Sequence, residues 1–292
     1  MSEYPLTYFQ MRLWYFDQLE PNTPAYNMSF ANRLFGPIDI EALNESVNYI
    51  TRRHPSLRAT FTKRQTDPVQ IIEEFKPFSI DRISAADTTG NDRSTEIQNI
   101  CLTESSKGFD LARGPMYRWV LINLGDNDNV LLFVVHQMVC DTCSLETIMK
   151  ELMSAYSAIV SGEPFELGPE SFHVGQYAVA ETEWMKTFEC ETQIAYWTSK
   201  LGNVPEPLEL PTDFSRPAFQ RFKGSSQSTV LDASLALKIN KLASRYDTTL
   251  FIVVLAAFKS LLFRYTNQDD LCVGYQIDNR HRLHVNDAVG SF

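Results

Sequence analysis

A chain of 292 residues with a net charge of −10, 44% hydrophobic and 21% charged residues has the composition of an ordinary globular protein. Its length fits one large domain or two mid-sized domains. The acidic balance argues against a nucleic-acid partner, and docking to another acidic protein would need a local basic patch.

The five cysteines form neither a paired zinc-binding pattern nor a disulfide framework. Cys140 and Cys143 make one isolated CxxC, so we expect reduced cysteines and no metal site. Residues 1–16 lack the charged start and apolar run of a signal peptide. The most apolar helical stretch, residues 250–258, is shorter than the ~20 residues of a membrane span. The sequence therefore predicts a cytoplasmic protein with no membrane partner and a buried helix at this stretch.

The first half of the chain alternates expected helices and strands. Residues 39–52 predict an amphipathic helix with Asp39 as its N-cap, which ends before Pro55. Further elements follow in order: strands over 57–61 and 69–74, a polar loop over 88–93, a helix through 97–102, and a hairpin of strands 117–124 and 130–135.

The second half contains several helices and two short strands. Residues 161–170 are rich in turn-forming residues and predict a link between two parts of the chain. After this link we expect a long helix over 176–201, a proline-rich passage, a strand over 228–231, helices over 234–246 and 248–265, and a strand over 271–277.

The stretch over residues 130–152 carries the strongest chemical signal. Six apolar residues lead to His136, and a helical period begins after Asp141. A histidine at a strand end near an aspartate at a helix start can be a general base with a charge partner. A packed structural histidine is the alternative. Ser144 lacks a GxSxG context and fits a helix start, and neither Cys140 nor Cys143 has an evident activating base. Phosphate-loop and dinucleotide fingerprints are absent.

Five stretches in order resemble the motifs of one enzyme family, the condensation domains of nonribosomal peptide synthetases. These stretches are residues 9–16 (FQMRLWYF), 53–61 (RHPSLRATF, against RHExLRTxF), 136–142 (HQMVCDT, against HHxxxDG), 176–184 (QYAVAETEW), and 273–280 with 289–292 (VGSF). The resemblance covers essentially the whole chain.

The resemblance implies an α/β fold of two lobes, each a sandwich of the chloramphenicol-acetyltransferase type. Residues 1–165 would form the N-terminal lobe around a mixed sheet, and residues 171–292 part of the C-terminal lobe, with His136 near the interface between them. In this family, peptidyl or acyl carrier proteins dock at two mouths of a tunnel and insert phosphopantetheine arms that carry an acyl donor and an amine acceptor. The domain itself binds no further cofactor, and its other partners are synthetase domains.

The resemblance also assigns roles to single residues. The second histidine of HHxxxDG is the catalytic one, and Gln137 stands at its position, so the motif is degenerate. His136 and Asp141 match the structural histidine and aspartate, and Asp141 is expected to pair with Arg58. Thr142 replaces a glycine that lets the backbone approach the tunnel. The motif residues Thr142, Tyr177 and Trp184 are candidates for lining that tunnel, and the second motif departs from its pattern at Pro55.

Three functional interpretations remain open from the sequence. The chain can be an inactive or weakened condensation-like domain that binds carrier proteins or recruits other synthetase components. It can be an active acyltransferase that joins a carrier-bound acyl donor to an amine, with Gln137 placing the amine. It can also be a fragment without function. The family's domain extends further after its glycine-phenylalanine motif, so the resemblance implies an incomplete, truncated second lobe.

Overall fold

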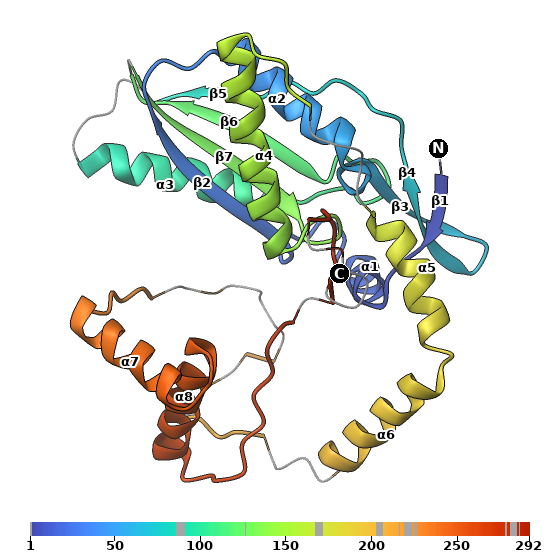
Figure 1. The fold of residues 1–292 in the computed structure, drawn as a ribbon, viewed down its shortest axis with the longest axis vertical. Helices are drawn as coiled ribbons and strands as arrows, with labels where there is room; N and C mark the ends of the chain where they lie inside the picture. Colours follow the sequence, from blue (N-terminus) through green and yellow to red (C-terminus); the bar gives the residue numbers. More distant parts are fainter. Residues whose placement is uncertain are drawn as a thin grey trace. The chain divides into compact units, whose positions relative to one another are not determined.

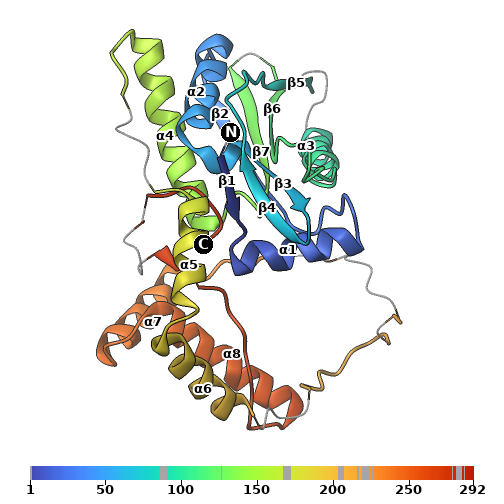
Figure 2. The same ribbon diagram turned by 90° about the vertical axis from the view of Figure 1, so that its right-hand side faces the viewer.

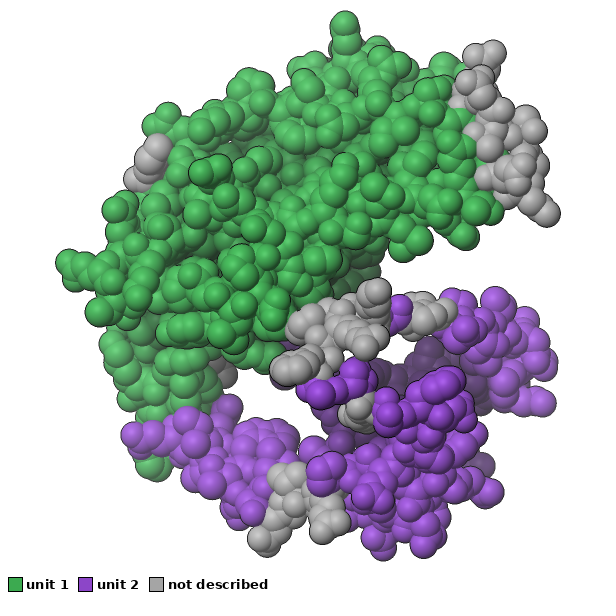
Figure 3. Space-filling model, turned by 180° about the vertical axis from the view of Figure 1, so that it is seen from behind, with its two compact units in different colours: residues 1–190, 278–292 green, residues 191–277 purple. Residues whose placement is uncertain are grey.

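The computed structural model describes residues 2–85, 91–125, 127–166, 172–202, 207–215, 217–218, 224, 227–277, 279–280, 285 and 287–292. These residues fall into two compact units, unit 1 (residues 1–190 and 278–292) and unit 2 (residues 191–277), coloured separately in Figure 3. Residues 86–90 of the expected polar loop and residues 167–170 of the expected link lie outside the described residues. The predicted division between lobes therefore stays a prediction.

Unit 1 contains two sheets. The three-stranded sheet has the order β1-β4-β3 and is antiparallel throughout. The four-stranded sheet has the order β2-β7-β6-β5 and is mixed, because β5 pairs parallel with β6 while β7 pairs antiparallel with both neighbours. This confirms the expected mixed sheet. The strands are β1 (Ser2–Pro5), β2 (Asn27–Phe35), β3 (Ala59–Arg64), β4 (Asp67–Ile72), β5 (Asp81–Ser84), β6 (Tyr117–Asn123) and β7 (Asp128–His136).

Helices cover both faces of the four-stranded sheet. In Figure 2, α2 and α4 lie on one face and α3 lies on the other. The helices of unit 1 are α1 (Tyr8–Leu19), α2 (Ile40–Arg53), the short 3-10 helix η1 (Pro55–Arg58), α3 (Asn91–Ser105), α4 (Thr142–Ser161) and α5 (Val174–Trp184). Figure 1 shows α4 running along the sheet, with its first turn at the carboxyl end of β7. Because both faces are covered, β7 is buried along its whole apolar run.

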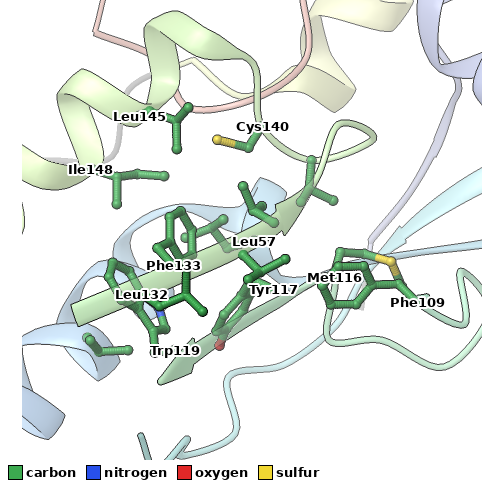
Figure 4. Packing of buried hydrophobic residues seen from close by; sticks show 14 of the residues in the cluster. Leu57, Phe109, Met116, Tyr117, Trp119, Leu132, Phe133, Cys140, Leu145 and Ile148 are labelled. Carbon is green, nitrogen blue, oxygen red and sulfur yellow. The ribbon is translucent and has the colours of Figure 1, made fainter. Parts of the chain in front are cut away.

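The main core forms between β6, β7 and the helices on one face. Phe133 of β7 stacks on Trp119 of β6 with a centroid distance of 4.0 Å. Leu145 and Ile148 of α4 point towards Phe133 in Figure 4 and are at most 3% exposed. A run of apolar residues at helical spacing on α4 therefore fixes this helix on the strand that precedes it.

Unit 2 consists of helices in its described part. Helix α6 (Phe188–Leu201) leads into it, and α7 (Ala233–Arg245) and α8 (Leu250–Thr266) pack on each other. Each of α7 and α8 has an N-cap whose side chain accepts a backbone hydrogen bond, Asp232 and Thr249 respectively. No single helix in the described chain is long and apolar enough to cross a membrane, although α7 and α8, bent by 104°, pass the length and composition test together.

Several sequence-based expectations need correction. The single helix expected over 176–201 is broken into α5 and α6 by a turn at residues 185–187. The strands expected over 228–231 and 271–277 are not formed, because the described residues of unit 2 offer no partner strand. Helix α8 forms as expected, but most of its apolar side chains are exposed rather than buried. The structure also contains elements that the sequence analysis did not predict: β1, α1, β2 and β5.

Candidate functional site

The candidate site is the turn of residues 136–141, here called the site turn, which joins β7 to α4. His136 is the last residue of β7, and Asp141 is the N-cap of α4, as the sequence predicts. The Asp141 side chain accepts a hydrogen bond from the backbone N–H of Ser144 at 2.8 Å. This capping explains why the helix begins at Thr142.

Backbone hydrogen bonds hold the first half of the site turn. The N–H of His136 donates to Met116 O at 2.8 Å, and the N–H of Gln137 donates to Tyr26 O at 2.9 Å. The side chain of Gln10, buried in α1, donates from Nε2 to Met138 O at 2.9 Å. Gln10 belongs to the first motif of the sequence analysis, so this motif supports the turn directly.

His136 is a buried, neutral residue in this arrangement. Its Nδ1 accepts a hydrogen bond from the N–H of Met138 at 3.1 Å, so the neutral ring carries its proton on Nε2. The rings of Tyr26 and Phe109 lie edge-on to it. Burial lowers the pKa of His136 to about 4. A histidine with this pKa is a poor proton acceptor near neutral pH, so the structural role predicted for it agrees with its surroundings.

Gln137 is half-buried, and its side-chain amide forms no hydrogen bond with any residue that the structure describes. It is therefore the polar group of the site turn that is available to a ligand. Thr142 is exposed at the start of α4 and has no positive φ. The backbone at this position therefore does not itself require the glycine that the family motif carries.

The ion pair of Asp141 differs from the predicted one. Both carboxylate oxygens of Asp141 accept hydrogen bonds from the Arg280 guanidinium, at 2.5 and 2.7 Å. The side chain of Arg280 is 4% exposed and that of Asp141 is 17% exposed. This is a largely buried, bidentate pair of the strong kind.

The predicted Arg58–Asp141 pair is thus wrong. Arg58 ends η1 and donates to the backbone carbonyl oxygens of Thr51, Arg52 and Glu73. Its side chain is committed to the end of α2 and to the residue after β4, away from the start of α4. Arg280 reaches Asp141 because the chain returns to unit 1 after unit 2, and a separation of 139 residues leaves no local signal of this contact.

The three predicted tunnel-lining residues have different surroundings. Tyr177 is 2% exposed and packs edge-on against Phe292 at a centroid distance of 5.2 Å, which contradicts an open, tunnel-lining position. Trp184 at the end of α5 is half-buried, and Thr142 is exposed. A tunnel-lining role for Thr142 and Trp184 stays a prediction.

Other reactive or charged groups of unit 1 serve the scaffold. Burial, with the negative charge of Asp141 nearby, raises the pKa of the Cys140 thiol well above its usual value, which disfavours the nucleophilic thiolate. His54 and Arg53 at the end of α2 contact the carboxylate of Glu151 in α4, at 2.7 and 3.3 Å. Burial acts to raise the pKa of Glu151, but these hydrogen bonds and charges outweigh it and lower the pKa.

Hollows in unit 1 lie apart from the site turn. One of about 270 Å³ lies beside Arg58 and is lined by residues that include Leu57, Phe78 and Tyr117. None of its lining residues belongs to the site turn. Among the residues that the structure describes, no three histidine, cysteine, aspartate or glutamate side chains gather in a way that could hold a metal ion.

Comparison with known proteins decides the family. The profile of the condensation domain matches residues 1–292. The chain belongs to the condensation-domain family. This condensation domain is 35% identical over 288 residues to one of the proteins of the linear gramicidin synthase of Brevibacillus parabrevis, an alignment that covers 99% of the chain and 4% of that protein. It is 32% identical over 289 residues to the bassianolide nonribosomal cyclodepsipeptide synthetase of Beauveria bassiana, covering 98% of the chain and 9% of that protein. The family is that of nonribosomal peptide synthesis, and the chain spans less than a tenth of the length of these relatives.

Solved structures share the fold. The first condensation domain of the calcium-dependent antibiotic synthetase superimposes with a TM-score of 0.83 at 19% identity, covering 100% of this chain and 68% of that chain. The X-domain from teicoplanin biosynthesis superimposes with a TM-score of 0.83 at 25% identity, covering 99% of this chain and 63% of that chain. The expected α/β condensation fold is therefore confirmed.

Proposed function

We propose that this condensation domain binds carrier proteins or other synthetase components and forms amide bonds slowly or not at all. The single observation that supports this is Gln137 at the position of the catalytic histidine, on a site turn whose supporting contacts are complete. A glutamine amide can donate and accept hydrogen bonds, but it does not take up a proton at neutral pH. The missing group is therefore the proton acceptor, while the scaffold around it is kept.

Amide formation places a demand that the neighbouring residues do not meet. The acceptor amine must lose a proton as it attacks the donor thioester, and a general base for this step works best with a pKa near the operating pH. His136, the adjacent imidazole, has a pKa of about 4, and its Nδ1 is occupied by the N–H of Met138. Asp141 is bound to Arg280 on both oxygens. Neither residue can replace the missing histidine.

Binding without rapid condensation remains chemically reasonable for this fold. The partners would be carrier proteins, whose phosphopantetheine arms bring the acyl and amine groups, and neighbouring domains of a synthetase. The X-domain of teicoplanin biosynthesis, similar in fold to this chain, is described in a complex with OxyB. A domain of this fold can therefore form a complex with another protein.

An active acyltransferase is the second candidate, and the available amide of Gln137 favours it. This amide can hydrogen-bond an amine and hold it against a thioester. Well-oriented intramolecular reactions gain roughly 7–11 kcal/mol from positioning, so loss of the base can slow the reaction without abolishing it.

The test uses loaded carrier proteins and the whole polypeptide that contains the chain. Affinity for the donor and acceptor carrier proteins is measured by titration, and amide formation by single turnover. We expect binding by the wild type with little amide formed, and similar affinity in a Gln137→His variant. If neither form binds carrier proteins, the proposal fails. Rapid amide formation by the wild type would establish the acyltransferase instead.

A further inference from the structure

The hydroxyl of Ser144 lies at the centre of a buried polar network. Ser144 is the third residue of α4 and is 0% exposed. Its Oγ lies 2.8 Å from Asp141 Oδ1, 2.9 Å from the Arg280 Nη2, and 2.9 Å from both the N and the O of Gly290. Four polar groups from three separate parts of the sequence thus meet at one side chain.

The chemistry of a hydroxyl determines the direction of these hydrogen bonds. Arg280 and the N–H of Gly290 can only donate, so they occupy the two accepting sites of Oγ. The single hydroxyl proton then goes to Asp141 Oδ1 or to Gly290 O. Gly290 O already accepts from the N–H of Asp141 at 3.0 Å, and a carboxylate is the stronger acceptor. With the proton on the side of Asp141, each of these four groups has a partner.

Residues 287–292, here called the strap, are held in one register by further contacts. The hydroxyl of Ser56 donates to Val289 O at 2.6 Å, and Val289 joins the main core. A side chain at Gly290 would meet Val174 at 2.9 Å and the Phe292 ring at 3.0 Å. The strap therefore approaches α5 so closely that its position at Gly290 cannot slide.

The strap is also the part of unit 1 that follows unit 2 in the chain. Unit 2 ends at Ile277, and Arg280 is the first described charged residue after it. We propose that Ser144 is a positioning residue: together with Arg280 it fastens the strap to Asp141 and so fixes the conformation of the site turn that carries Gln137. This goes beyond the proposed carrier-protein binding and does not depend on it.

The consequences of removing the hydroxyl follow from the network. Without Oγ, the N–H of Gly290 loses its acceptor in a buried position, and Arg280 and Asp141 each lose one contact. An unsatisfied buried donor is costly, so the strap opens more often. Each opening also frees the N–H of Asp141, because its acceptor is Gly290 O.

The experiment compares Ser144→Ala with Ser46→Ala as a matched control. Ser46 is also 0% exposed and helical, but its hydroxyl donates only within α2, to Ala42 O at 2.6 Å. Hydrogen exchange is measured by mass spectrometry on peptides that contain residues 136–145 and 285–292. The ¹⁵N signal of His136 Nδ1 is recorded in parallel, because this atom accepts the N–H of Met138 and reports the shape of the turn.

We expect Ser144→Ala to raise exchange in both peptides at least tenfold and to shift or split the His136 Nδ1 signal, with exchange in β6 and β7 unchanged. Ser46→Ala should leave both readouts as in the wild type. Unchanged readouts in Ser144→Ala, or equal changes in the control, would overturn the proposal. If Ser144→Ala does not fold, Ser144→Cys, which keeps a weak donor and acceptor, should show the same changes to a smaller extent. Wild-type exchange in that variant would overturn the proposal as well.

Discussion

Units 1 and 2 both contain strongly apolar elements, but they bury them to very different extents. In unit 1, residues 130–135 of β7 are all at most 4% exposed, because helices cover both faces of their sheet. In unit 2, Leu262 is the buried apolar residue of α8 in the described chain, while Phe251, Ile252 and Val254 are about half exposed. Helical or strand character thus follows from the local sequence, whereas burial needs a second layer.

The largest expected effect lies in unit 1, at the ion pair of the site turn. Asp141→Ala leaves the Arg280 guanidinium buried without its carboxylate, and breaking such a pair typically costs ~3–5 kcal/mol. The control is Arg33→Ala, which removes the pair with Asp128 whose arginine side chain is 49% exposed. Exposed pairs contribute about 0–1 kcal/mol. Urea unfolding measures both variants, and equal small losses would show that the Arg280 pair does not stabilise unit 1.

A pair of leucines compares the units directly. Leu132 of β7 is 1% exposed, and Leu261 of α8 is 49% exposed. Leu132→Ala should lower the free energy of unfolding by ~2–5 kcal/mol because it leaves a cavity. Leu261→Ala should change it by less than about 0.5 kcal/mol, as surface substitutions do. A loss at Leu261 as large as that at Leu132 would contradict the difference in burial between the units.

Acid should act on unit 1, because all five histidines lie there. The pKa of His136 is lowered from 6.5 to about 4 in the folded state by burial. Below pH 6.5 the unfolded chain takes up a proton that the folded chain does not, so stability falls as the pH drops towards 4. The loss from this residue is on the order of 3 kcal/mol, at about 1.4 kcal/mol per unit of pKa.

The measurement is the free energy of unfolding of unit 1 against pH in the wild type and in His136→Asn, whose amide oxygen can still accept the N–H of Met138. The variant should lose less stability than the wild type between pH 6.5 and 4. Parallel curves for the two proteins would show that His136 does not titrate in this way.

The smallest effect distinguishes two serines at the strap. Ser291 is 1% exposed, and its hydroxyl has no hydrogen-bond partner in the part of the chain that the structure describes. Ser291→Ala should therefore be neutral or slightly stabilising, whereas Ser56→Ala removes the donor to Val289 O and should cost roughly 1–3 kcal/mol. Thermal unfolding orders the two variants, and a reversed order would contradict the contacts assigned to the strap.

Much of unit 1 is predictable from the sequence, because its signals are local. The amphipathic pattern and Asp39 predict α2, and the two apolar runs around residues 125–129 predict β6 and β7. Asp141 as the start of α4 follows from a change of period from strand to helix. By contrast, β2 carries asparagine and arginine among its apolar residues, so its sequence NMSFANRLF lacks a clear alternation. Its pairing with β7 supplies what the local sequence does not.

The site turn is predictable in its residues but not in its contacts. His136, Gln137 and Asp141 lie together because they are close in sequence. The partner of Asp141 could not be derived, since Arg280 follows all of unit 2 and no spacing rule links the two residues. The network around Ser144 was missed for the same reason, because serine at a helix start is explained by capping alone.

The most direct test of the central claim, that Gln137 removes the proton acceptor from an intact site turn, is the single-turnover rate of amide formation with loaded carrier proteins. The comparison is between the wild type and a Gln137→His/Thr142→Gly variant of the whole polypeptide that contains the chain. General-base catalysis is typically worth ~10²–10⁴-fold, so the variant should be at least ten times faster than the wild type. Equal and rapid rates in both proteins would contradict the claim, because Gln137 would then not be the missing group.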